Sequence, residues 1–260
     1  METGLFSKKF IGFVGVCTAL VIFVCYLFFD LRIVMVVKRA MGMPKPMLTI
    51  VDEVPTQLYF DKVLPIAQRN GISIGCNVEP WHVNNWQKWS KVSLKDCLDA
   101  GLEVIPMCRT YKDSDKVIQS KAEYRKQVIA EQDFFKKVGI QTDVIVLPWR
   151  KRNRELANKV LPEFYQASIL RWGRQMNSWP MKSRYEISEL GPKMTYEEMS
   201  RFVDGVAYDN CWGIMMLRTW NKKSMTPESF DDLDKVIQYA RQQGVEVVPL
   251  REGLKRFARD

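Results

Sequence analysis

Short apolar runs alternate with amphipathic runs along most of this chain, and this alternation limits the possible folds more than any other feature. Such a pattern is typical of repeated βα units, whose strands pair into a parallel sheet. The pattern predicts strands at Met47–Val51, Ser73–Val78, Glu103–Met107, Asp143–Leu147, Ala167–Leu170, Gly213–Leu217 and Val245–Pro249. It predicts helices at Leu58–Arg69, Leu94–Ala100, Ala122–Val138, Arg154–Val160, Thr195–Val206 and Pro227–Gln243.

A single α/β domain of the (β/α)7 barrel type accommodates this series better than two domains would. The whole chain has 260 residues, which is within the range of one such barrel. Glycines support the helix ends, because a glycine in the left-handed conformation is a common helix terminator. They are Gly71, Gly101, Gly139 and Gly244.

An apolar segment precedes the predicted barrel. Residues Phe10–Phe29 carry no charge, follow two lysines and end at Asp30. This is long enough for one transmembrane helix, and no small residues mark a cleavage site, so we predict an uncleaved single-pass anchor. The expected organisation is a tail (1–9), an anchor (10–29), a juxtamembrane linker (30–46) and a barrel domain (47–260).

Charge and cysteines add weaker constraints. Basic residues after the span slightly outnumber those before it, so the positive-inside rule does not favour an external domain, although a short tail can lie on either side. The net charge is +9 and the barrel part is mildly basic. Cys76, Cys97, Cys108 and Cys211 have no C-x-x-C spacing, which argues against a zinc cage and does not define the compartment.

The first predicted strand ends in a distinctive run, Met47-Leu48-Thr49-Ile50-Val51-Asp52-Glu53-Val54-Pro55. It resembles the T-F-D-D-G segment of the NodB-homology polysaccharide deacetylases, a family of carbohydrate esterases. In that comparison Val51 stands at the position of the catalytic base and Asp52 at that of a metal ligand. Ala100-Gly101-Leu102-Glu103-Val104 is similar to the family's A-G-H-E-I turn, and the order of such matches extends from Met47 to Phe257.

The resemblance implies a NodB-like barrel, an extracytoplasmic domain, a polysaccharide substrate and a divalent metal. The metal-ligand set, however, is incomplete in this chain. The family's H-x-x-x-H motif falls on Arg109 and Asp113. Its late histidine, which protonates the leaving group in that family, falls on Arg218. His82 is the only histidine and lies in another loop, so two imidazole ligands are not available and we predict no bound metal.

Candidate site residues follow the predicted strands, because barrels of this type form their active sites at the carboxyl ends of the strands. Guanidinium groups pair with carboxylate or phosphate, and indole rings stack on sugars. The candidate catalytic residues are Asp52, Glu53 and Glu79, and the candidate substrate-binding residues are Arg109, Trp149, Arg150, Trp172, Arg218 and Trp220.

Structural roles are open for the same residues. The acids at the end of the first strand could be neutralised by Arg109 or Arg218, the tryptophans could pack in the barrel, and the basic run from Arg150 could be a solvated helix start. His82 could be an ordinary loop residue.

Three functions fit these residues. The first is a membrane-anchored, deacetylase-like pseudoenzyme that binds an anionic cell-envelope polysaccharide and no nucleic acid. The second is an active carbohydrate hydrolase, either a divergent amidohydrolase or a metal-free glycoside hydrolase that uses two of Asp52, Glu53 and Glu79. The third is a structural or interaction module.

Overall fold

A computed structural model of the chain describes residues 40–79, 93–108, 120–140, 142–147, 154–170, 176–191, 193–221 and 225–257, together with Leu20 and Val37. The chain divides into two compact units, Met1–Pro44 and Lys45–Asp260. The predicted anchor Phe10–Phe29 lies outside the described residues except for Leu20. Within the described part, no helix combines the length and apolar character needed to cross a bilayer.

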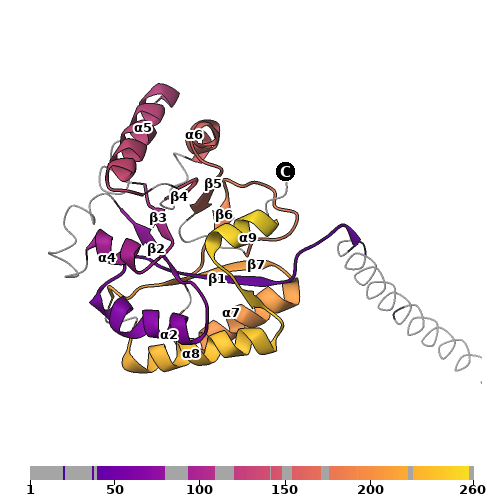
Figure 1. Cartoon of the computed structure of the whole chain (residues 1–260). Helices are drawn as coiled ribbons and strands as arrows, with labels where there is room; N and C mark the ends of the chain where they lie inside the picture. Colours follow the sequence, from indigo (N-terminus) through magenta and orange to yellow (C-terminus); the bar gives the residue numbers. More distant parts are fainter. Residues whose placement is uncertain are drawn as a thin grey trace, which may run out of the picture. The chain divides into compact units, whose positions relative to one another are not determined.

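A parallel sheet forms the centre of the second unit (Figure 1). Its middle strand, β1 (Met47–Asp52), pairs along its whole length with β7 (Trp212–Leu217) and on its other edge with β2 (Gly75–Val78). Beyond β2 lies β3 (Val104–Pro106), and the short β8 (Glu246–Val247) pairs with the start of β1. The residues of β1, β2, β3 and β7 are buried, so these strands form part of the core.

A second parallel sheet contains β4 (Val144–Leu147), β5 (Ala167–Leu170) and β6 (Ile187–Ser188). Single bridges connect its two edges to the first sheet: Met107 pairs with Val146, and Leu190 pairs with Met215. The strand pairings therefore follow the order of the sequence from β1 to β7, and β7 returns to β1.

Helices alternate with these strands. A π-helical turn (Tyr59–Val63) continues into α2 (Leu64–Arg69), and a 3-10 turn (Leu161–Glu163) follows α6. The other helices are α4 (Leu94–Asp99), α5 (Lys121–Lys137), α6 (Arg154–Val160), α7 (Tyr196–Asp209), α8 (Pro227–Gln242) and α9 (Leu250–Phe257). Helix α7 packs against α8 and against β1 and β7, whereas α5 packs against α6 (Figure 1).

The predicted elements are largely confirmed as parts of an α/β fold. All seven predicted strands and all six predicted helices are present, with shifts of a few residues at their ends. The four terminating glycines have positive φ angles of 60° to 84°, as predicted. Among the described strands and α-helices, β6 and α9 were not predicted, and the last predicted strand is reduced to the two residues of β8.

Helix α9 is fixed by side chains from distant parts of the sequence. Its first two backbone N–H groups, at Leu250 and Arg251, donate to the carboxylate of Glu103 at 2.8 and 3.0 Å. Its last residue, Phe257, packs against the buried Trp212 with ring centroids 6.0 Å apart. These contacts explain why a helix of only eight residues is stable here, because most helical stability in proteins comes from tertiary packing.

Candidate functional site

The carboxyl ends of four parallel strands place a group of polar side chains at one end of the fold. Asp52 ends β1 and Glu53 follows it, Glu79 follows β2, and Glu189 follows β6. Arg218 and Thr219 follow β7, which is paired with β1 so that Leu217 lies beside Asp52. Ligand sites in parallel α/β folds form at this end of the strands.

Asp52 is completely buried, and Thr219 donates hydrogen bonds to both of its carboxylate oxygens. The backbone N–H of Thr219 donates to Oδ1 at 3.0 Å, and the Thr219 hydroxyl donates to Oδ2 at 2.5 Å. Burial raises the pKa of Asp52 to about 7, although both hydrogen bonds from Thr219 act in the opposite direction. The carboxyl group therefore changes its charge near neutral pH while it stays out of contact with solvent.

The Thr219 hydroxyl has three oxygen neighbours. Besides Asp52, it lies 3.3 Å from the carbonyl oxygen of Val54 and 3.2 Å from the hydroxyl of Thr56. A hydroxyl carries one proton, so it donates to only one acceptor at a time. When Asp52 is ionised, the Thr219 hydroxyl donates its hydrogen bond to the Asp52 carboxylate. When Asp52 is neutral, its own O–H can donate to the Thr219 oxygen, and the Thr219 hydroxyl can then donate to the carbonyl oxygen of Val54.

Glu53 and Arg218 form an ion pair next to Asp52. Nε of Arg218 lies 3.6 Å from Oε2 of Glu53, and only 6% of the Glu53 side chain and 20% of the Arg218 side chain are exposed. Burial lowers the pKa of Arg218, and the negative charge of Glu189 opposes this effect. The guanidinium also lies over Gly191, since a Cβ there would be 2.7 Å from Nη2. This ion pair is the arrangement expected if Arg218 has a structural role and neutralises an acid at the end of the first strand.

Glu189 is a fully buried carboxylate that the sequence did not reveal. Nδ2 of Asn77, in β2, donates to Oε2 of Glu189 at 3.2 Å. Its strand, β6, has only two residues, too few to produce an alternating pattern. The available signal was an acidic residue that directly follows Ile187 and Ser188 and precedes Gly191. With Glu189, the site contains buried carboxyl groups beside the partly exposed guanidinium of Arg218.

The remaining candidates are only partly covered by the structure. Glu79 is buried at the end of β2, and the indole of Trp220 is 46% exposed just beyond β7. The other predicted binding residues lie outside the described residues: Arg109, Trp149, Arg150 and Trp172, as does His82. A hollow of about 490 Å³ is found elsewhere, at the amino-terminal ends of β3 and β4.

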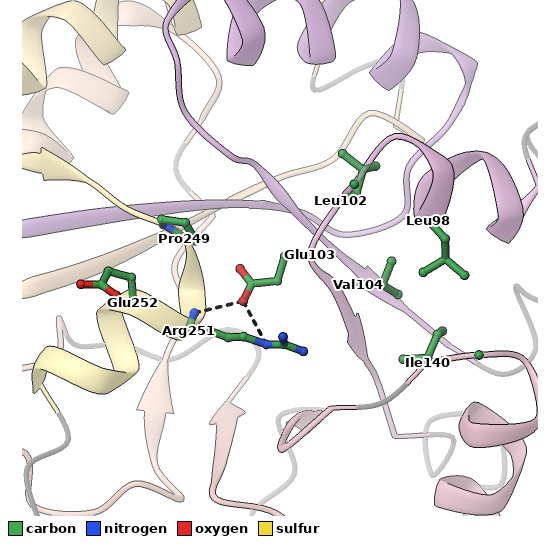
Figure 2. Close-up of a pocket in the computed structure, with 10 residues that line it drawn as sticks. Leu98, Leu102, Glu103, Val104, Ile140, Pro249, Arg251 and Glu252 are labelled. Atoms are coloured by element: carbon green, nitrogen blue, oxygen red, sulfur yellow. Dashed lines mark hydrogen bonds and ion pairs between the residues drawn. The ribbon is translucent and has the colours of Figure 1, made fainter.

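This hollow is apolar on one side and charged on the other (Figure 2). Leu98, Leu102, Val104 and Ile140 supply the apolar side, and Glu103 points toward the start of α9. Glu103 accepts two backbone hydrogen bonds there and pairs with Arg251, whose Nε is 3.7 Å away. Its carboxylate is thus already used to hold α9, and the hollow contains none of the predicted catalytic residues.

Three solved structures with the same fold are named as deacetylases. A peptidoglycan N-acetylglucosamine deacetylase from Eubacterium rectale matches with a TM-score of 0.51 and 12% identity, over 80% of this chain and 89% of that chain. A second peptidoglycan N-acetylglucosamine deacetylase, solved with a benzamide compound, matches with a TM-score of 0.52 and 12% identity, over 81% and 89%. A deacetylase solved with its substrate matches with a TM-score of 0.52 and 13% identity, over 83% and 97%.

This chain has the fold of the polysaccharide deacetylases. The family resemblance predicted from the sequence is therefore confirmed in the fold. No family model and no curated protein sequence matches the chain.

The divalent metal that the deacetylase fold implies does not fit the described side chains. Both oxygens of Asp52, the residue at a ligand position by resemblance, are engaged by donors of Thr219. The neighbouring Glu53 is paired with a guanidinium, which repels a second cation. Within the described ranges, no group of three or more histidine, cysteine, aspartate or glutamate residues is arranged to hold a metal ion. We therefore assign no catalytic step to a metal.

Proposed function

We propose that this protein is a membrane-anchored, polysaccharide deacetylase-like pseudoenzyme that binds a cell-envelope polysaccharide. In this proposal the seven strands β1–β7 close into a (β/α)7 barrel, which is supported by the two bridges between the sheets. The anchor is Phe10–Phe29, and the barrel domain lies outside the cytoplasmic membrane, where such polysaccharides are found.

One observation supports the loss of metal-dependent deacetylation: protein groups already contact the two acids at the carboxyl end of β1. Thr219 binds both oxygens of Asp52, and Arg218 pairs with Glu53. Hydrolysis by a metal-bound water needs open coordination positions on the metal and ligands that are free to bind it. An arginine stays protonated at any physiological pH, so its charge cannot be removed to admit a metal.

Solvent-facing residues at the carboxyl ends of the strands indicate the kind of ligand. Trp220 directly follows Thr219, and its indole is the exposed ring at this end of β7. Indole faces stack on the apolar faces of sugar rings. The proposed preference for an anionic polysaccharide rests on the sequence positions of Arg109 and Arg150, which also follow strands. The similar structures are named as peptidoglycan deacetylases, which makes peptidoglycan a suitable first test ligand.

The test combines binding with catalysis. The full-length protein should bind peptidoglycan fragments, release no acetate from N-acetylglucosamine oligomers with or without added zinc, and lose affinity in Trp220→Ala. Loss of one stacking ring should weaken binding by about 1 kcal/mol, or roughly fivefold. The control is Tyr208→Ala, because Tyr208 is 90% exposed on α7, before β7 begins. Acetate release that depends on metal would refute the loss of deacetylation, and equal binding by both variants would refute the stacking site.

A second function, metal-free glycoside hydrolysis, is favoured by one observation. Burial raises the pKa of Asp52 to about 7, which is the range of a general acid at neutral pH. Glu53 or Glu79 would then be the second carboxylate that glycosidases need. Reducing-end release that disappears in both Asp52→Asn and Glu79→Gln would establish this function. The complete burial of Asp52 behind Thr219 makes it the weaker candidate.

A further inference from the structure

Two buried thiols lie together beside the candidate site. Cys76 is in β2 and Cys97 is in α4, and the side chains of both are completely buried. The two side chains are joined by a hydrogen bond, and both belong to the main apolar core. Both are present as free thiols in the structure.

A neighbouring tyrosine confirms that the two thiols share one small region. The phenol of Tyr59 is buried and donates to the carbonyl oxygen of Ile74 at 2.8 Å. Its pKa is raised by burial first, and then by the nearby charges of Cys76, Asp52 and Cys97 when these groups ionise. The two cysteines, one in β2 and one in α4, therefore both lie near Tyr59.

We propose that Cys76 and Cys97 form a disulfide bond that joins β2 to α4 when the protein folds in an oxidising compartment. The reaction removes two electrons and two protons from the two thiols and creates one S–S bond. The oxidant is a disulfide, either oxidised glutathione or the disulfide of a thiol oxidoreductase, which is reduced to two thiols. The step requires one cysteine thiolate to attack that disulfide and the second cysteine to displace the resulting mixed disulfide.

The reaction belongs to folding rather than to the finished structure. Burial and the adjacent Cys97 raise the pKa of Cys76, so its reactive thiolate is scarce once the core has formed. No part of either side chain is exposed to a dissolved oxidant in the folded protein. Oxidation therefore precedes the final packing of α4 on β2, and the finished core then protects the bond from reduction.

The bond would fix one strand of the candidate site. Cys76 lies beside Asp52 in the paired strands β2 and β1, and Asn77 directly follows it. Asn77 in turn holds the buried carboxylate of Glu189. A covalent link from Cys76 to α4 closes a loop of about 20 residues and restricts the unfolded chain, which is the main source of stabilisation by a disulfide in the loop-entropy model.

Thiol trapping and peptide mapping test the proposal directly. The full-length protein is refolded with oxidised glutathione, alkylated in denaturant without a reductant, digested and analysed by mass spectrometry. We expect a linked peptide containing Cys76 and Cys97, and alkylated Cys108 and Cys211. The double variant Cys108→Ser/Cys211→Ser should keep the linked peptide, and Cys97→Ser should lose it. Alkylation of Cys76 and Cys97 in the wild-type protein, or a link to any other cysteine, would overturn the proposal.

Thermal stability gives a second measurement that needs no substitution in the pair. Protein refolded with a thiol reductant should have a Tm roughly 5–10 °C below that of protein refolded with oxidised glutathione, the shift expected for a loop of this length in a domain of this size. The Cys108→Ser/Cys211→Ser variant should show the same difference between the two refolded forms, whereas Cys76→Ser/Cys97→Ser should show none. Equal Tm values for the two refolded forms of the wild-type protein would refute a stabilising bond. The proposal does not depend on polysaccharide binding, so each can fail without the other.

Discussion

Replacement of Asp52 by asparagine should make the protein more stable at neutral and alkaline pH. The burial of Asp52 raises its pKa from the ordinary value of 3.8 to about 7. A carboxyl group with a raised pKa in the folded state contributes most stability below its unfolded pKa, and this contribution is lost as the pH rises toward the folded pKa. Each pKa unit corresponds to about 1.4 kcal/mol, so the loss approaches roughly 4 kcal/mol above about pH 7.

The hydrogen bonds around position 52 make asparagine a close substitute for the neutral acid. Its Oδ1 can accept from the backbone N–H of Thr219, and its amide N–H can donate to the Thr219 hydroxyl. That hydroxyl can then donate to the carbonyl oxygen of Val54, which is already 3.3 Å away. The asparagine variant thus keeps every bond of the protonated state and cannot ionise.

Urea unfolding followed by tryptophan fluorescence measures the effect. The stability advantage of Asp52→Asn over the wild-type protein should grow by about 2–3 kcal/mol between about pH 5 and about pH 8. Thr219→Val is the matched control, because it removes the hydroxyl that favours the charged form and should widen the pH range of the loss. A difference between Asp52→Asn and wild type that does not vary with pH would refute the buried, near-neutral carboxyl group.

Three further results are expected. The purified protein should contain no stoichiometric zinc by elemental analysis, because Asp52 has no histidine partners at the positions given by the resemblance; one tightly held metal ion per chain would contradict this. Protein isolated from membranes should retain Phe10–Phe29 and require detergent, and a mature amino terminus after Phe29 would exclude the anchor. Gly253→Ala should lower the stability by about 1–3 kcal/mol in thermal or urea unfolding, because its Cβ would lie 2.5 Å from the Trp212 ring; a neutral effect would show that α9 moves freely away from β7.

The alternation of apolar and amphipathic runs was sufficient to predict most of the fold. Each strand of at least three residues, and each helix from α2 to α8, produces a local pattern that sequence alone can reveal. The two elements that were not predicted are short. Strand β6 has two residues, and α9 has only eight, although its buried residues Leu250, Leu254 and Phe257 lie on one face of the helix. The position of α9 depends on the carboxylate of Glu103 and on the ring of Trp212, which are distant in the sequence, and such contacts cannot be read from a window of sequence.

The sequence predicted where the candidate residues lie better than it predicted which of them form ion pairs. Residues that end parallel strands collect at one edge whatever the details of packing, and this placed Asp52, Glu53 and Arg218 correctly at the same end. Which of them pair with one another depends on rotamers and on close backbone approaches. Arg218 reaches Glu53 by lying across Gly191, a contact between segments that no spacing rule connects.

The charge balance of this buried cluster explains how an arginine is accommodated beside the acids at the end of β1. Asp52, Glu53 and Glu189 are buried within a small region, and three ionised carboxylates cannot share it without a cation or a proton. Arg218 supplies one fixed positive charge, and the near-neutral pKa of Asp52 shows that this carboxyl group is readily protonated. A chain without the imidazole ligands of a metal site can thus keep acids at these strand ends because one guanidinium and one proton offset their charge. The same two groups make the site poor at binding a metal cation, so loss of the histidines and retention of the acids are physically compatible in this fold.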